Sequence, residues 1–139
     1  MIRYALAYVV SGVVFAALDM IWLSLAGPAL YRPILGSILA ERFSAPPAIA
    51  FYLLYVLGIT VFASAPGLRA ESWTKAALLG AVLGLVAYAT YDLTNQATLK
   101  VWATRITLAD MAWGAFATAS AAAAGVKASL AIVRVMAAR

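Results

Sequence analysis

Four long apolar stretches constrain this chain more than any other feature of its sequence. They run approximately over residues 4–25, 47–65, 73–99 and 107–126. A helix needs about 20 mostly apolar residues to cross the hydrocarbon core of a bilayer, and a helix satisfies its own backbone hydrogen bonds there. We therefore predict an all-α integral membrane protein, a four-helix bundle that forms one membrane domain over residues 1–139.

The composition supports lipid as the solvent. Hydrophobic residues make up 66% of the chain, against about 45–50% apolar residues in soluble domains, and a soluble protein of this size has too little interior to bury them. The net charge of +5 is spread between the apolar stretches. We therefore expect membrane lipids as partners and no nucleic acid.

The chain contains no cysteine and no histidine. Disulfides, thiolate metal sites and iron–sulfur clusters are thereby excluded, as is catalysis that depends on histidine. We expect no metal site and no cofactor. Any acid–base chemistry must use Asp, Tyr, Lys or water.

The segment of residues 28–43 differs from the four spans. Its apolar residues recur at helical spacing, but it also carries charged side chains and is too short to cross a bilayer. We predict a short amphipathic helix that lies in the membrane interface between spans one and two. Gly27-Pro28 is expected to end the first span, and Pro66-Gly67 the second.

The loops indicate an orientation through their Lys and Arg residues. One side of the membrane would hold Arg3, Arg69, Lys75, Lys127, Arg134 and Arg139, and the other Arg32, Arg42, Lys100 and Arg105. This excess predicts that the N-terminus and the C-terminus are both cytoplasmic.

Three aspartates lie in or at the ends of the apolar stretches. Asp19 is late in the first span, Asp92 is late in the third and Asp110 is early in the fourth, so antiparallel spans place all three toward the same membrane face. A carboxylate at bilayer depth costs roughly 2.5–3.5 kcal/mol and normally faces a partner or a wet cavity. We predict a polar pocket that opens to one face. The other ligand- or ion-binding candidates are Trp22, Tyr88, Tyr91, Asn95, Gln96 and Trp113, with Tyr31 and Arg32 nearby.

Each aspartate also has a structural interpretation. Thr107 and Asp110 have the spacing of a capping box at the start of span four. Asp19 could pair with an arginine of the adjoining loops. Asp92 has no basic residue within one helical turn, and it is therefore the first candidate for a functional carboxylate.

The third span carries the clearest helical face. Gly80, Gly84, Tyr88, Asp92 and Gln96 recur every four residues. Its two glycines form the G-x-x-x-G pattern that lets two membrane helices approach closely. The face is either the wall of the polar pocket or a packing seam whose polar residues bond their neighbours.

A short pattern repeats in the first and last spans. Asp19 and Trp22 have the same D-M-x-W arrangement as Asp110 and Trp113. Residues three apart share a helix face, so each indole N–H can point near its own carboxylate or near that of the other span.

These segments together resemble a known family. They are Leu18–Leu23, Phe51–Gly58, Tyr88–Asn95 and Asp110–Gly114. The chain resembles domain-of-unknown-function family 2177, small four-span proteins of the bacterial inner membrane. The resemblance covers nearly the whole chain up to Gly125 and marks Asp19, Trp22, Tyr91, Asp92, Asn95, Asp110 and Trp113. It implies a multi-pass protein of the bacterial cytoplasmic membrane and carries no activity.

Three functions fit these residues. The first is binding or transport of a small molecule, ion or lipid in the aspartate-lined pocket, because aromatic walls with a few polar groups are typical of ligand sites. Transport with only four spans would require a homodimer. The second is a structural or accessory subunit whose polar residues fix the bundle. The third is a lipid-modifying enzyme, which lacks support because no nucleophile lies beside a base.

Overall fold

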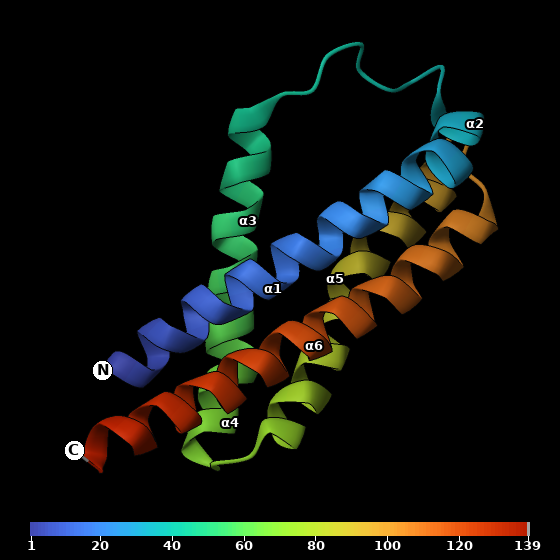
Figure 1. Ribbon diagram of the computed structural model, residues 1–139. Helices are drawn as coiled ribbons and strands as arrows, with labels where there is room; N and C mark the ends of the chain where they lie inside the picture. The colour runs from blue at the N-terminus through green and yellow to red at the C-terminus, as the bar shows by residue number, and fades with distance from the viewer. Residues whose placement is uncertain (139) are drawn as a thin grey trace.

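Four long helical segments form the chain, as the apolar stretches predict. The computed structural model describes residues 1–138, and its helices run over Ile2–Leu35, Ala45–Arg69, Trp73–Thr98 and Thr104–Ala137. Each is long and apolar enough to cross a membrane. The four-helix membrane bundle is thus confirmed. Both termini lie at one end of it, and the connection between the first two segments arches over the other end (Figure 1).

The first two segments are interrupted by wider turns. The first consists of α1 (Ile2–Ala26), the π-turn η1 (Gly27–Tyr31) and α2 (Arg32–Leu35). The second consists of α3 (Ala45–Ile59), the π-turn η2 (Thr60–Ser64) and α4 (Ala65–Arg69). The third and fourth segments are the uninterrupted helices α5 (Trp73–Thr98) and α6 (Thr104–Ala137).

Proline explains why these helices widen and continue where the sequence predicts stops. Each π-turn contains the residue four positions before a proline, Ala29 before Pro33 and Phe62 before Pro66. In a regular helix the proline ring would clash with that carbonyl. A π-turn moves the carbonyl to a partner five residues on, as in the bond from the Arg32 N–H to Gly27 O. The first segment continues past Pro28 to Leu35 and the second past Pro66 to Arg69, so the expected ends at Pro28 and Pro66 are wrong.

The segment expected to be an interfacial helix over residues 28–43 is helical only as far as Leu35. Residues 36–44 form turns and an extended connection that is exposed along its length. A short helix is marginal unless another element packs against it. The connection arches away from the helices (Figure 1), so that packing is missing.

The bundle is held together along α6, which packs against α5 on one side and α1 on the other. Small residues allow the close approach. A Cβ on Gly84 would lie 2.6 Å from the carbonyl carbon of Gly114, and one on Gly80 would lie 2.8 Å from Thr118 O. The G-x-x-x-G of the third span is therefore a close helix contact.

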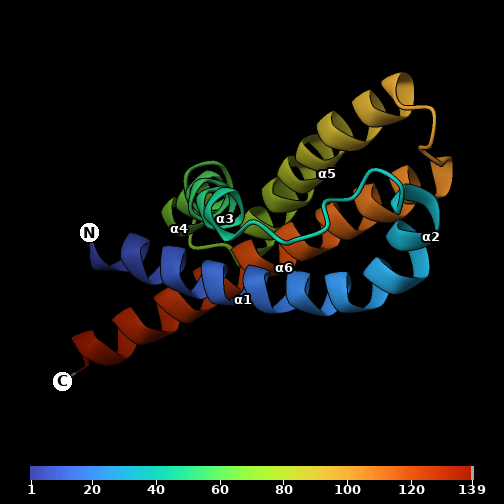
Figure 2. The same ribbon diagram turned by 90° about the horizontal axis from the view of Figure 1, so that it is seen from above.

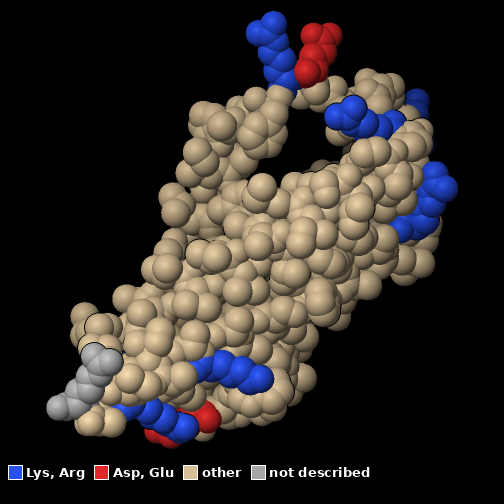
Figure 3. Space-filling model, in the orientation of Figure 1, with Lys and Arg blue, Asp and Glu red and all other residues tan. Residues whose placement is uncertain are grey.

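The helix α3 leaves the bundle at its N-terminal end. Its buried residues, Val56 and Ile59, belong to its last turn, and burial continues in η2 and α4. Seen from above, α3 lies beside the crossing of α1 and α6, and its direction differs from theirs (Figure 2). In the space-filling view a gap opens below the arching connection. The charged residues on this face lie near the two ends of the molecule (Figure 3).

Candidate functional site

A cavity of about 740 Å³ lies at the end of the bundle away from the termini. Residues of α1, η1, α2, α3, α5 and α6 line it, together with the connections before α3 and before α6. Its walls include Asp19, Asp92 and Asp110, and the aromatic residues among them are Trp22, Tyr31, Phe43, Phe51, Tyr55, Tyr88, Tyr91 and Trp102. Its size is within the range of small-molecule sites, about 300–1,000 Å³. The structure thus brings the three aspartates of different spans to one cavity.

Asp110 is bound by two donors from the first segment. The Tyr31 hydroxyl donates to its Oδ1, and the Trp22 Nε1–H lies 3.2 Å from the same oxygen. The Trp22 Nε1–H also donates to the Tyr31 hydroxyl at 2.8 Å. The π-turn places Tyr31 for this contact, because it is the last residue of η1. Asp110 therefore ties α6 to the end of α1.

Asp19 is bound by the second span. The Tyr52 hydroxyl of α3 donates to Asp19 Oδ2, and the Asp19 side chain is 7% exposed. Within residues 1–138 the structure contains no ion pair of Asp19 with an arginine; the ion pair it does contain joins Arg134 to Glu71 at the other end. The alternative that Asp19 pairs with a loop arginine is therefore wrong.

Asp92 differs from the other two aspartates. Its side chain is fully buried, and neither carboxylate oxygen has a hydrogen-bond partner among residues 1–138. Its carboxyl lies beside the Asp110 carboxyl across the α5–α6 interface, where two ionised acids repel each other and a protonated one can donate to the other. Leaving a buried polar group without a partner costs about 1–3 kcal/mol, and more when the group is charged. The residue ranked first from the sequence is thus the one whose position the fold itself does not explain.

The two copies of the D-M-x-W pattern meet between α1 and α6, but only one of them donates to the other. The rings of Trp22 and Trp113 stack at 4.7 Å with an interplanar angle of 8°. Trp22 donates to Asp110 of the other copy of the pattern, as one of the two expected arrangements predicts. The equivalent donor does not bond: Trp113 Nε1 is buried and unpartnered within the described chain, while Asp19 accepts from Tyr52.

The remaining predicted residues divide into two groups. Tyr88 and Tyr91 line the cavity. Asn95, Gln96 and Trp113 lie outside its lining. The Thr107 hydroxyl donates to Gln96 Oε1 at 2.6 Å, and Gln96 Nε2 donates to Thr104 at 3.0 Å. These bonds give Gln96 a structural explanation at the α5–α6 turn.

The prediction of a capping box at Thr107 and Asp110 is also wrong. Helix α6 begins at Thr104, with Ala103 as its N-cap. Thr107 lies inside the helix, and its hydroxyl accepts a hydrogen bond from Trp102 Nε1 at 2.9 Å. Asp110 therefore lies well past the N-terminal end of α6, beyond the reach of its first free N–H groups.

Several cavity residues are not predicted from the sequence. Tyr55 of the cavity wall and Tyr52, which bonds Asp19, follow an apolar helical pattern that a lipid-facing span would also show. Phe43, Phe51 and Trp102 carry no chemical signal that distinguishes a cavity wall from a lipid anchor. Tyr55 bonds Thr118 of α6 at 2.8 Å, so it closes the inner end of the cavity.

The carboxylates do not form a shared metal site. Among residues 1–138, no three acidic side chains come close enough to hold one ion. Asp19 and Asp110 are directed at different tyrosines. The cavity instead presents separate acceptors along an aromatic wall, an arrangement that suits an organic ligand.

Comparison with known proteins places the chain in a family. A family model described as "Predicted membrane protein (DUF2177)" matches residues 4–127. No curated protein and no solved structure matches the chain. The protein therefore belongs to the DUF2177 family of predicted membrane proteins, in agreement with the resemblance noted from its motifs.

Proposed function

We propose that this membrane protein binds a small organic cation in the aspartate-lined cavity. The observation that carries the proposal is Asp92, a fully buried carboxylate beside the cavity without a hydrogen-bond partner in residues 1–138. An ammonium group that donates to it would supply both the opposite charge and the missing hydrogen bond.

The composition of the cavity wall favours a cation over an anion. Three aspartates and one basic residue, Arg32, line it. The faces of Trp and Tyr rings attract cations within about 6 Å, and the wall is rich in such rings. An anion would meet two or more carboxylates at short range.

Binding has more support than passage across the membrane. Toward the termini, the cavity is followed by the closely packed contacts of α5 with α6 around Gly84 and Gly114. A transport path through one copy would have to open these contacts. Transport therefore stays a prediction that requires a homodimer.

A structural role is the second candidate, and a specific observation favours it. The hydrogen bonds of Tyr52 with Asp19 and of Tyr31 with Asp110 link helices across the bundle. They account for two of the three aspartates without a ligand. Asp92 is what separates the two functions, because no tyrosine or tryptophan of the described residues donates to it and its neighbour across the bundle is another acid, Asp110.

We place the protein in the bacterial inner membrane with both termini in the cytoplasm. Both termini lie at the same end of the bundle (Figure 1), where Arg3, Arg69, Lys75, Lys127 and Arg134 also belong. The excess of basic residues favours the cytoplasm for that end. The chain lacks cysteine, so an Arg42→Cys variant labelled in whole cells by an impermeant maleimide tests this. Labelling only after the cells are broken would contradict it.

Binding is tested with benzylammonium as the probe. The protein in nanodiscs is titrated with benzylammonium and, as a neutral control, benzyl alcohol, while the fluorescence of Trp22 and Trp102 in the cavity wall is followed. We expect Asp92→Asn to weaken benzylammonium binding at least about tenfold, because a charge-assisted bond is lost. The matched control is Glu71→Gln, an exposed carboxyl at the other end, which should change nothing.

The proposal fails under either of two results. One is that no saturable benzylammonium signal is seen with the unaltered protein. The other is that Asp92→Asn binds the probe as well as the unaltered protein does. A phenotype confined to lower stability in Asp19→Asn and Asp110→Asn would favour the structural role.

A further inference from the structure

The cavity is open on its side, beside the N-terminal half of α3. Four of its lining residues come from four different segments and are also well exposed. They are Leu23 of α1, Phe43 of the connection, Phe51 of α3 and Tyr91 of α5, with exposed fractions between 44% and 84%. We call these four residues the lateral opening. Leu23, Phe51 and Tyr91 belong to membrane spans, where an exposed side chain contacts lipid, so the opening connects the cavity with the bilayer.

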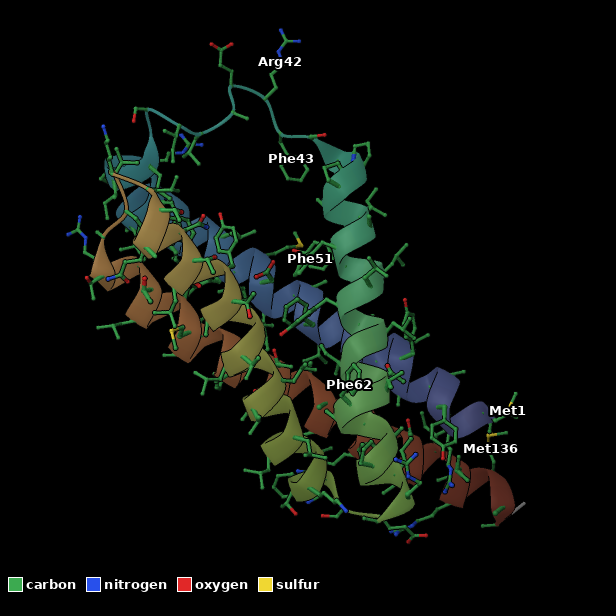
Figure 4. All side chains as sticks on the ribbon, turned by 180° about the vertical axis from the view of Figure 1, so that it is seen from behind. Met1, Arg42, Phe43, Phe51, Phe62 and Met136 are labelled. Carbon is green, nitrogen blue, oxygen red and sulfur yellow. The ribbon has the colours of Figure 1, made fainter. Side chains whose placement is uncertain are left out.

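A gap in the molecular surface lies beside the N-terminal half of α3, where the lateral opening is. Figure 3 shows the gap below the arching connection, between the upper end of α3 and the rest of the bundle. In Figure 4, Phe43 hangs below the connection and Phe51 points from α3 toward the other helices, so both rings border the gap, whereas Arg42 points away from the bundle. The side of the cavity is thus bordered by apolar rings and its outer rim carries the charge.

Helix α5 shows how the wall changes from polar to apolar. Residues four apart share a helix face. Tyr88 and Asp92 form the inner stripe, where the Tyr88 ring packs against Gly114 of α6. Ala87 and Tyr91 form the neighbouring stripe, which leads to the lateral opening. A ligand that fits both stripes has a charged head and an apolar remainder.

We infer that the ligand is an amphiphile with an ammonium head and an apolar chain, which enters from the bilayer through the lateral opening. This inference rests on the proposed function, since it takes the head group to be held at Asp92. The chain would lie between Phe51 and the Ala87–Tyr91 stripe and extend into lipid. Two sources share this chemistry, a simple alkylamine and an aminophospholipid. The phosphate of the aminophospholipid would accept hydrogen bonds from Arg32 in the same wall.

The experiment is a competition in nanodiscs of phosphatidylcholine and phosphatidylglycerol. Bound benzylammonium is displaced by dodecylammonium, dodecanol or added phosphatidylethanolamine, each at the same mole fraction of the lipid. We expect displacement by dodecylammonium, by phosphatidylethanolamine or by both, and none by dodecanol, which lacks the charge. Displacement by the alkylamine alone identifies a simple amine as the source, and displacement by phosphatidylethanolamine identifies a bilayer lipid.

A substitution tests the route. Ala87→Trp places a large ring in the lateral opening, and we expect the ratio of dodecylammonium affinity to benzylammonium affinity to fall about tenfold. The matched control is Val86→Trp, one residue away on the exposed face of α5, which should leave the ratio unchanged. Nanodisc thermal melts of both variants verify that they are folded.

The outcomes separate the inference from the proposed function. If benzylammonium binds but neither long-chain ammonium compound displaces it, the lateral route is overturned and the cation site stands. The lateral route is also overturned if Ala87→Trp and Val86→Trp give equal affinity ratios. If benzylammonium does not bind at all, the proposed function and the inference fail together.

Discussion

The two halves of this bundle are built on different principles. In the half near the termini, Gly80, Gly84 and Gly125 bring backbones into direct contact, and Ser11 of α1 donates to Ala121 O of α6 at 3.0 Å. In the half near the connection, the helices are separated by aromatic rings and joined by tyrosine–aspartate hydrogen bonds. The same four segments therefore form a solid packed core at one end and a cavity at the other.

The difference shows what sets helix separation in a membrane. Lipid is as apolar as a leucine side chain, so burial of apolar surface does not drive helices together, and close packing of small residues must do so. Where large rings replace small residues, the helices stay apart. The remaining space needs polar contacts to be stable, and among the described residues no donor reaches the carboxylate of Asp92.

The largest effect is expected in the packed half. Gly84→Ala puts a Cβ 2.6 Å from the carbonyl carbon of Gly114, a backbone atom that cannot rotate away. We expect a loss of about 3 kcal/mol in the free energy of unfolding, measured by denaturant titration in mixed micelles. Gly58→Ala is the matched control, because nothing lies within 4 Å of the added Cβ. Equal losses in both variants would contradict the close contact.

The aspartates of the cavity half should respond with opposite signs. Asp92→Leu removes a buried carboxylate without a partner and should raise the free energy of unfolding by about 1–3 kcal/mol. Asp110→Leu leaves the Tyr31 hydroxyl without its acceptor and removes one of the two acceptors of the Trp22 N–H, and it should lower the free energy of unfolding by a similar amount. Both are measured by the same titration. A destabilised Asp92→Leu would show that Asp92 supports the fold.

The two stacked tryptophans give a smaller contrast. Trp22→Phe removes a donor that bonds Tyr31 and Asp110, and we expect a loss of about 1 kcal/mol, in line with interhelical hydrogen bonds in membranes. Trp113→Phe removes an N–H without a partner in the described chain, so its loss should be smaller. The difference between the two unfolding energies cancels the common change in ring size. Equal losses in the two variants would mean that both tryptophan N–H groups contribute equally to stability.

The smallest effect concerns the two serine N-caps. Ser72 Oγ accepts from the Lys75 N–H at 3.2 Å at the start of α5, whereas Ser44 makes no such bond at the start of α3. Ser72→Ala should therefore cost about 0.5–1 kcal/mol, and Ser44→Ala close to nothing. Thermal melts in detergent measure both. A larger effect at Ser44 would show that the upper end of α3 is more firmly held than its packing indicates.

Much of the fold follows from patterns that the sequence displays. The apolar stretches predict the spans because the length of a helix in lipid is fixed by the bilayer. The positions of Asp19, Asp92 and Asp110 along antiparallel spans predict a common depth. The hydrogen-bond partner of each polar side chain could not be predicted from the sequence. A threonine such as Thr107 has the same sequence pattern whether it caps a helix or bonds Gln96.

The helix ends predicted from proline residues differ most from the structure. Pro28 and Pro66 predict helix ends, yet both helices continue. The π-turn η2 accommodates Pro66, whereas η1, which contains Pro28, accommodates the later Pro33. In water the exposed backbone would be solvated, but in lipid every carbonyl must find a partner in the helix. A local rule learned from soluble proteins therefore gives the wrong boundary here.

By itself, the sequence determined that the chain crosses the bilayer four times, that small residues line the helix contacts and that three carboxylates share one depth. These features depend on hydropathy and helical period, which are local. Only the tertiary structure decided which carboxylate is free, because that depends on whether Tyr31 and Tyr52 reach Asp110 and Asp19 from other helices. It also decided that the N-terminal part of α3 stands apart from the other helices, since helix separation depends on contacts between residues far apart in the chain.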